Sequence, residues 1–268
     1  MLAFSSLLGN VEGQNIYRIW YDKPASYWEE ALPVGNGRIA AMVFGDPQLE
    51  QIQLNEETVS AGSPYQNYNE EAKTALPEMR RLIFEGKYEE AQNMAATKIL
   101  SQVGNEMPYQ TVGRLNIRYQ DHKKVNNYYR DLDISNAVAV TRYEVDGVEF
   151  TEETFASFTD QLVIRHIKAS KPGTINCELF FNTPMRDPKR SIYGKKGLRL
   201  EGITYGSRYF LGKVHYCADL DVKHKGGKVI TANDTLLSVQ GASELTLYIS
   251  MATNFVNYKD ISGDPYQR

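Results

Sequence analysis

From residue 115 onward, apolar and polar residues alternate with a period of two, which predicts strands that each have one buried face. Asp146-Gly147 separates two such runs and is a strong signal of a two-residue hairpin, and Gly226-Gly227 and Asn233-Asp234 mark further turns. About ten strands at regular spacing favour an antiparallel sandwich over alternating strands and helices. The predicted strands of this half are 137–145, 148–155, 162–169, 174–181, 198–204, 216–222, 228–232, 235–240 and 245–252.

Residues 70–100 carry the one clearly helical pattern. Pro77 is expected to break or restart the helix, and Gly86 is placed to end it before a second helix. We expect the apolar stripes of both helices to pack against a sheet. The stripes are formed by Leu76, Met79, Leu82 and Ile83, and by Tyr88, Ala91, Met94 and Ala95.

The stretch from Leu32 to Pro64 predicts two strands that present two polar loops. Residues 33–38 form a turn with Arg38 at its tip, and 39–44 read as a short strand buried on both faces. Residues 50–54 alternate like a strand with one wet face, and 55–58 begin a polar loop. The two loops are expected to lie near each other, where they could contact a ligand or another domain. On the pattern alone, an ordinary hairpin is the simpler interpretation.

Composition limits the partners and the chemistry. The 268 residues are 42% hydrophobic, so the chain can bury a large core as one domain. The 30 basic and 33 acidic residues give a net charge of −3 without a long block of one sign, which argues against nucleic-acid and anionic-membrane partners. No nucleotide-binding or nucleophile motif occurs, and no metal or cofactor is expected. The four histidines, His122, His166, His215 and His224, lack metal-ligand spacing.

The N-terminus resembles the remnant of a signal peptide. An apolar run at 2–8 precedes Val11-Glu12-Gly13, which fits a signal-peptidase site, although no basic region comes first. We therefore predict a remnant over 1–14 and a protein that works in the periplasm or outside the cell; an unstructured or locally packed leader is the alternative. Cys177 and Cys217 lie inside strand-like runs, which favours free buried thiols over a disulfide.

Several segments, in order, resemble the N-terminal domain of glycoside hydrolase family 95, the α-L-fucosidases, some of whose members act on α-L-galactosides. The resemblance extends from about Ile16 to Asp264. Two residues depart from the family pattern: Val59 stands where a tryptophan is usual, and Ala40 where a glycine is usual. These departures leave the substrate preference open. The matching segments are Trp20–Ala25 (WYDKPA), Trp28–Arg38 (WEEALPVGNGR), Leu54–Thr58 (LNEET), Arg81–Gln92, Tyr109–Leu115 and Tyr129–Asp133.

The resemblance implies a mainly β fold, an antiparallel two-sheet β-supersandwich similar to that of galactose mutarotase, with a small helical insertion. It implies a sandwich domain over 15–264 and, at 265–268, the start of a linker to an (α/α)6 catalytic barrel. That barrel would be the partner of this domain and would act on a fucosylated glycan.

The resemblance also places the family's catalytic residues in that barrel, so it carries no catalytic residue onto this chain. The residues that it does carry over would hold the barrel or line the rim of its pocket. They are Asn36, Gly37, Arg38, Asn55 and Glu56.

Hydrolysis of a glycoside ordinarily needs two carboxyl groups that face one bond. Glu30, Asp46, Glu56 and Glu57 are conceivable members of such a pair, but 33 acidic residues place neighbours together by chance. A stand-alone carbohydrate-binding module is therefore the alternative to a fucosidase domain.

Overall fold

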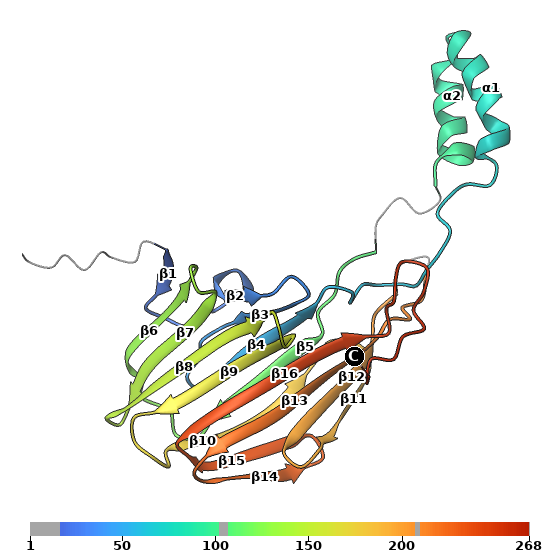
Figure 1. The fold of residues 1–268 in the computed structure, drawn as a ribbon. Coiled ribbons are helices and arrows are strands. Elements are labelled where there is room, and N and C mark those ends of the chain that lie inside the picture. The colour runs from blue at the N-terminus through green and yellow to red at the C-terminus, as the bar shows by residue number, and fades with distance from the viewer. Residues whose placement is uncertain (1–16, 102–106, 207–209, 268) are drawn as a thin grey trace, which may run out of the picture.

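The computed structural model describes residues 17–101, 107–206 and 210–267, so the signal-peptide remnant predicted for 1–14 lies outside the described residues. The described chain forms two antiparallel sheets that face each other (Figure 1). This confirms the predicted mainly β, two-sheet sandwich. A short 3-10 helix, η1 (Trp28–Glu30), precedes the second strand.

One sheet has nine strands and the other has seven. In spatial order, the nine-stranded sheet consists of β1 (Arg18–Tyr21), β6 (Asn126–Asp133), β7 (Val138–Val145), β8 (Val148–Ser157), β9 (Leu162–Ala169), β16 (Glu244–Thr253), β13 (His215–Lys225), β12 (Gly197–Ile203) and β11 (Arg186–Tyr193). The seven-stranded sheet consists of β14 (Lys228–Asn233), β15 (Leu236–Ala242), β10 (Ile175–Asn182), β5 (Gly113–Tyr119), β4 (Leu49–Glu56), β3 (Ile39–Val43) and β2 (Leu32–Gly35).

The turns explain how the chain passes through the two sheets. Asp146 and Gly147 both have positive φ, 50° and 76°, so the predicted two-residue hairpin between β7 and β8 is confirmed. Gly226-Gly227 also turns the chain, but it carries it from β13 in one sheet to β14 in the other. The last strand, β16, lies in the middle of the nine-stranded sheet, between β9 and β13.

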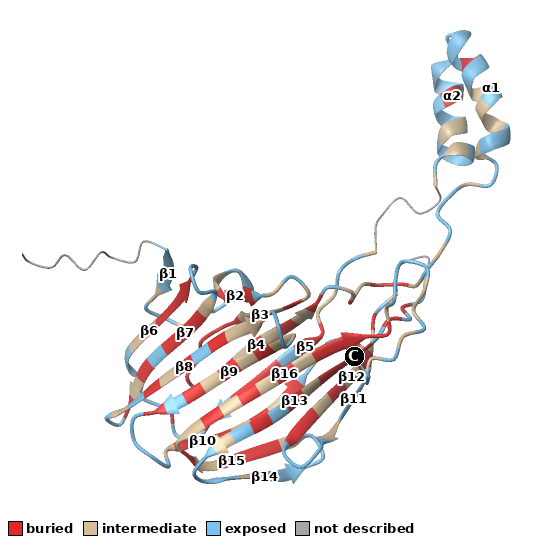
Figure 2. Ribbon diagram, viewed as in Figure 1, coloured by how far each residue is buried: buried red, intermediate tan, exposed pale blue. Residues whose placement is uncertain are grey.

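Alternation of side chains builds the core between the sheets, which appears as bands of buried residues along the strands in Figure 2. On β3, Ile39, Ala41 and Val43 are each 1% exposed, whereas Ala40 and Met42 point the other way and are partly exposed. The expectation that this strand is buried on both faces was therefore wrong. The reason is that β3 belongs to a sheet with one face on the core, and no further layer of the described residues covers the other face.

A charged network lies inside this apolar core. Arg165 on β9 forms an ion pair with Glu152 on β8, and its Nη2 lies 3.4 Å from Oε2 of Glu50 on β4. The hydroxyls of Tyr119 and Tyr143 donate to Oε1 of Glu152 at 2.5 and 2.7 Å. Glu50, Glu152 and Arg165 are at most 1% exposed. The network therefore joins the two sheets through fully buried charges.

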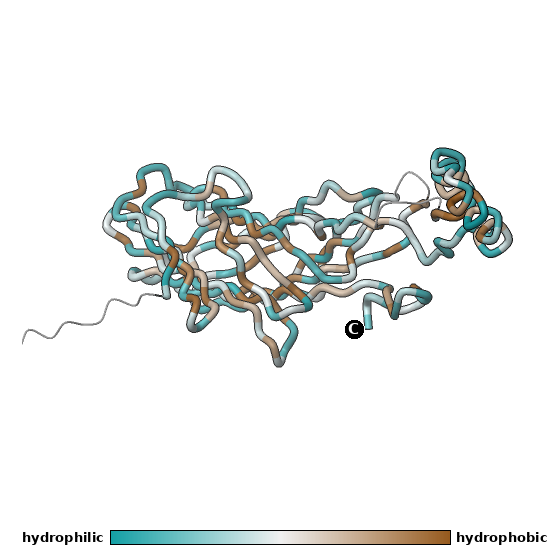
Figure 3. Tube along the Cα trace, turned by 90° about the horizontal axis from the view of Figure 1, so that it is seen from above, coloured by the Kyte–Doolittle hydropathy of each residue, from teal (hydrophilic) through white to brown (hydrophobic). Residues whose placement is uncertain are grey.

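The helical region consists of α1 (Ala72–Phe84), α2 (Tyr88–Met94) and a π-helical turn, η2 (Ala95–Ile99). These helices pack on one another and stand away from the sandwich (Figures 1 and 3). The predicted location of the helices is confirmed, but the expectation that they pack against a sheet was wrong. None of the described helices is long and apolar enough to cross a membrane.

Pro77 does not break α1, contrary to expectation. A proline removes the hydrogen bond to the carbonyl four residues earlier, here that of Lys73, which is exposed to water. Helix α1 nevertheless continues through Pro77. Gly86 ends the helix as predicted, with φ of 77° and with the Lys87 amide donating to the carbonyl of Leu82 at 2.9 Å.

Candidate functional site

The turn between β2 and β3 is fixed by Asn36. Its Oδ1 accepts hydrogen bonds from the amides of Arg38 and Ile39, at 3.0 and 2.9 Å, while its Nδ2 donates to the carbonyl of Ser157 at 2.8 Å. Gly37 adopts a φ of 97°, which a residue with a side chain rarely takes. Asn36 thus both shapes the turn and ties it to the end of β8 in the opposite sheet.

Arg38 spans the two sheets. Its Nε donates to Oε1 of Gln161 at 2.7 Å and its Nη1 to the carbonyl of Met251 at 3.0 Å; both partners belong to the nine-stranded sheet or its β8–β9 turn. The same Nη1 lies 3.4 Å from Oε1 of Glu56 at the end of β4. The Arg38 side chain remains 33% exposed. The guanidinium therefore stabilises the end of the sandwich and still reaches its surface.

Glu56 lies buried behind this arginine, with 3% of its surface exposed. It accepts hydrogen bonds from the amide and the hydroxyl of Thr58, at 2.8 and 2.6 Å, and the Thr58 hydroxyl lies 2.5 Å from that of Thr253. Burial raises the pKa of Glu56, and the hydrogen bonds from Thr58 oppose this shift. Asn55, one residue earlier, is partly exposed, and the Tyr109 hydroxyl donates to the backbone carbonyl of Glu56 at 3.0 Å.

The two predicted loops are therefore adjacent, and their five singled-out residues lie at one end of the sandwich. Their role toward a catalytic barrel stays a prediction. Pattern reasoning missed Gln161, Met251 and Thr253, because their sequence distance from the loops gives no sign of contact. Val59 is fully buried, so at this position the chain presents its side chain to the core.

The other conceivable carboxylates serve local turns. Asp46 accepts hydrogen bonds from the amides of Gln48 and Leu49, and Glu30 accepts one from the amide of Ser26. Among the described residues, no group of three or more His, Cys, Asp or Glu side chains could hold a metal ion.

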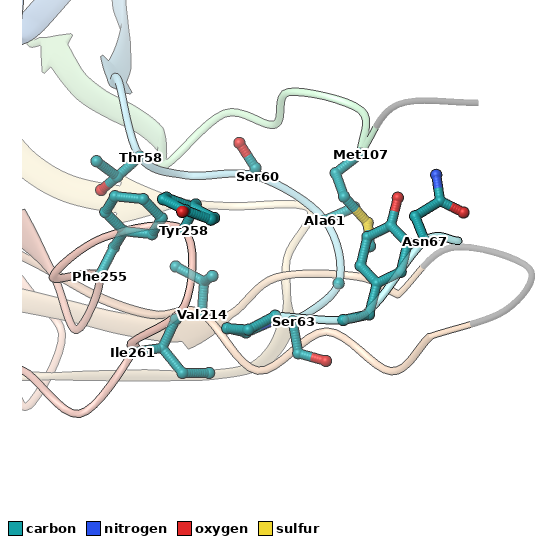
Figure 4. Close-up of a pocket in the computed structure, with 13 residues that line it drawn as sticks. Thr58, Ser60, Ala61, Ser63, Asn67, Met107, Val214, Phe255, Tyr258 and Ile261 are labelled. Carbon is teal, nitrogen blue, oxygen red and sulfur yellow. The ribbon is translucent and has the colours of Figure 1, made fainter. Parts of the chain in front are cut away.

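A hollow of about 370 Å³ opens beside Thr58, and Figure 4 shows the side chains that line it. They come from the segment after β4, from Met107, from Val214 before β13 and from the segment after β16. The lining is mostly apolar, with hydroxyl and amide groups but no carboxyl or imidazole group, so it offers shape and contact rather than acid–base chemistry. The lining residues are Thr58, Ser60, Ala61, Gly62, Ser63, Pro64, Tyr65, Asn67, Met107, Val214, Phe255, Tyr258 and Ile261.

Outside the site, Cys177 and Cys217 are both free and buried, which confirms the expectation of unpaired thiols. Cys177 lies on β10 and Cys217 on β13, in different sheets.

The comparisons with known proteins agree with this fold and define its class. Residues 19–258 match the model of the family described as "Glycosyl hydrolase family 65, N-terminal domain". A solved structure described as "Putative kojibiose phosphorylase from human microbiome" shares the fold, with a TM-score of 0.50 at 10% identity over 96% of this chain and 34% of its own. The chain is thus an N-terminal β-sandwich domain of the glycoside hydrolase type.

Its relatives make the class more specific. The chain is 32% identical to "Alpha-L-fucosidase 2" of Arabidopsis thaliana over 91% of its own length and 31% of the relative's. It is 26% identical to "Probable alpha-fucosidase A" of Aspergillus niger over 88% of its own length and 30% of the relative's. The chain belongs to the family of glycosyl hydrolase N-terminal domains matched above, and its resemblance to fucosidases is confirmed. It spans about a third of the length of these relatives.

Arg38→Ala is expected to lower the free energy of unfolding by about 1–3 kcal/mol, because it removes charge-assisted bonds between the sheets and leaves Glu56 buried with fewer partners. Urea denaturation measures this loss. Arg80→Ala is the control, since the Arg80 side chain is exposed on α1. Equal midpoints for the two variants would show that Arg38 does not hold the sheets together.

Proposed function

We propose that this chain is the non-catalytic N-terminal domain of an exported α-L-fucosidase that hydrolyses terminal α-L-fucosyl, or related α-L-galactosyl, linkages in glycans. In this role it packs on the catalytic barrel of the same protein and supports it. The main support for this proposal is the similarity to fucosidases. The match to Alpha-L-fucosidase 2 covers 91% of this chain but only 31% of that relative. Most of such a protein then lies outside this domain.

The site chemistry supports a role without catalysis. A glycosidase must protonate the leaving oxygen and activate a water or nucleophile on the other side of the bond, commonly with two carboxyl groups about 5–9.5 Å apart. The hollow beside Thr58 has no carboxyl group in its lining. Of the two acidic residues that precede Thr58, Glu57 is exposed, and Glu56 is buried and bonded to Thr58 and Arg38. These contacts suit a structural carboxylate.

The end of the sandwich that carries Arg38 and Asn55 has a surface suited to contact with a catalytic barrel. Arg38 and Asn55 reach the surface there, and the apolar hollow lies beside them. An interdomain contact of this kind would combine a buried apolar centre with a polar rim. The Arg38 guanidinium, already fixed by Gln161 and Met251, would be a rigid part of that rim.

The test compares the 268-residue chain with the longer protein that contains it, using an aryl α-L-fucoside as substrate. We expect turnover from the longer protein and none from the chain. Proton transfer alone is typically worth about 10²–10⁴-fold in rate, and the lining of the hollow has no carboxyl group to carry it out. Glu56→Gln and Asp46→Asn in the chain serve as controls. Turnover by the chain that either substitution abolishes would place catalysis in this domain, and binding of fucosylated glycans without any longer protein would favour a carbohydrate-binding module.

A further inference from the structure

The helices α1, α2 and η2 form an arm, residues 72–99, that extends away from the sandwich (Figure 1). Its tip carries large apolar side chains in the open: Phe84 is 89% exposed, Tyr88 69% and Ile83 41%. The tip lies at the turn between α1 and α2, the part of the arm farthest from the sheets in Figure 1. Three neighbouring apolar side chains therefore have no cover within the described domain.

The arm has little core of its own. Within it only Leu82 and Ala91 are buried, as the mostly pale helices in Figure 2 show. Isolated helices shorter than about 12–15 residues are marginal in water, and α1 has 13 residues and α2 has 7. Most of the stability of helices in proteins comes from packing against other elements, and these two short helices bury little against each other. Contact with another surface would supply the packing that they lack.

Several charges near the turn of the arm are already paired with one another. Arg81 binds Glu78, with Nε to Oε2 at 2.8 Å, and also binds Glu85, which Lys87 approaches at 3.1 Å. A partner surface therefore need not supply counter-charges to this part of the arm. The tip therefore offers a partner apolar contact area, with the exposed Glu89 and Glu90 beside it.

We propose that Ile83, Phe84 and Tyr88 dock the arm on the catalytic part of the same full-length protein, an inference that rests on the proposed function. The matched family is one of N-terminal domains, and about two thirds of each relative lies outside the match. The arm, the hollow beside Thr58 and the segment after β16 gather at one end of the sandwich (Figure 1). Helix α1 alone spans about 20 Å, so the arm and the hollow would contact one docked domain at two separated points.

The experiment compares the longer protein with its double variant Phe84→Ser/Tyr88→Ser by amide hydrogen exchange. We expect residues 72–99 to be protected in the parent and to exchange about tenfold faster or more in the variant, because local opening becomes easier when the docked tip is lost. Ile230→Ser is the matched control: Ile230 is 39% exposed on β14, an edge strand far from the arm. It should leave exchange of the arm unchanged.

Two outcomes would overturn this proposal. Exchange of the arm that is fast in the parent, or unchanged in the double variant, would show an arm without a docking surface. Conversion of a dimer to a monomer by the double variant, measured by light scattering, would assign the tip to a second copy. Fucosidase activity of the parent is recorded separately: an inactive parent contradicts the proposed function, whereas an active parent with an unprotected arm contradicts only the docking.

Discussion

Arg165→Met is expected to lower the free energy of unfolding by about 3–5 kcal/mol, since removing one partner of a buried ion pair leaves uncompensated charge in the core. Arg165 forms an ion pair with Glu152, lies 3.4 Å from Glu50 and donates to the hydroxyl of Thr154 at 2.8 Å. All these side chains are at most 1% exposed. The substitution leaves two carboxyl groups facing each other without the cation between them.

Chemical denaturation of four variants, Arg165→Met, Glu152→Gln, the combination of the two, and Arg118→Met, tests this expectation. Arg118→Met is the matched control, because Arg118 is 54% exposed in its pair with Glu178 and such pairs contribute about 0–1 kcal/mol. Arg165→Met combined with Glu152→Gln should be less destabilised than the sum of the single variants, as expected for groups in direct contact. Additive losses, or a loss for Arg165→Met no larger than that for Arg118→Met, would contradict a coupled buried network.

The free energy of unfolding of the parent is expected to fall between pH 5 and pH 8. Glu50→Gln is expected to make this fall smaller. Burial raises the pKa of Glu50 from 4.5 to about 7, although Arg165 opposes the shift. The folded state therefore keeps a proton that the unfolded chain releases. The resulting stabilisation is complete below pH 4.5 and is lost as the pH rises through 7, with a magnitude on the order of 3 kcal/mol.

The difference between parent and variant isolates Glu50 from its neighbours. Burial also raises the pKa of Glu56, which acts in the same direction, and lowers that of His122, which acts in the opposite one. Both groups are present in either protein, so they cancel when the two pH profiles of unfolding are subtracted. Glu149→Gln, at an exposed residue of β8, is the control. Parallel profiles for Glu50→Gln and the parent would show that Glu50 keeps the same protonation in both states.

Much of the fold follows from the sequence because alternation reports directly which residues face the core. The runs that became β7 to β10 and β12 to β16 are read this way, together with their turns. Strand β11 is missed because most of its residues are exposed. Strand β6 is missed because its buried residues include the charged Arg130 and Asp131. The arm was misplaced because an apolar stripe shows that a helix needs a partner without showing which one.

The candidate site, too, could be predicted only in part from the sequence. The proximity of the two loops is predictable, because short connections keep neighbouring strands together. The partners of Arg38 from the other sheet, Gln161 and Met251, are not, since they are fixed by how two sheets stack across more than a hundred residues of sequence. Glu50 has the parity of Ile52 and Leu54, which places it inward, but nothing in the pattern identifies Arg165 as its neighbour.

Because β16 lies in the middle of its sheet, the nine-stranded sheet cannot be completed until this last strand has been synthesised. Before Glu244–Thr253 has emerged from the ribosome, β9 and β13 cannot be bridged, and each end of the unfinished sheet has an open edge of the kind that invites aggregation. From Ala169 at the end of β9 to Glu244 at the start of β16 the ribosome must add 75 residues, as 244 − 169 = 75. At about 5–20 residues per second this takes roughly 4–15 s. During that interval the edge of β9 that later pairs with β16 is open.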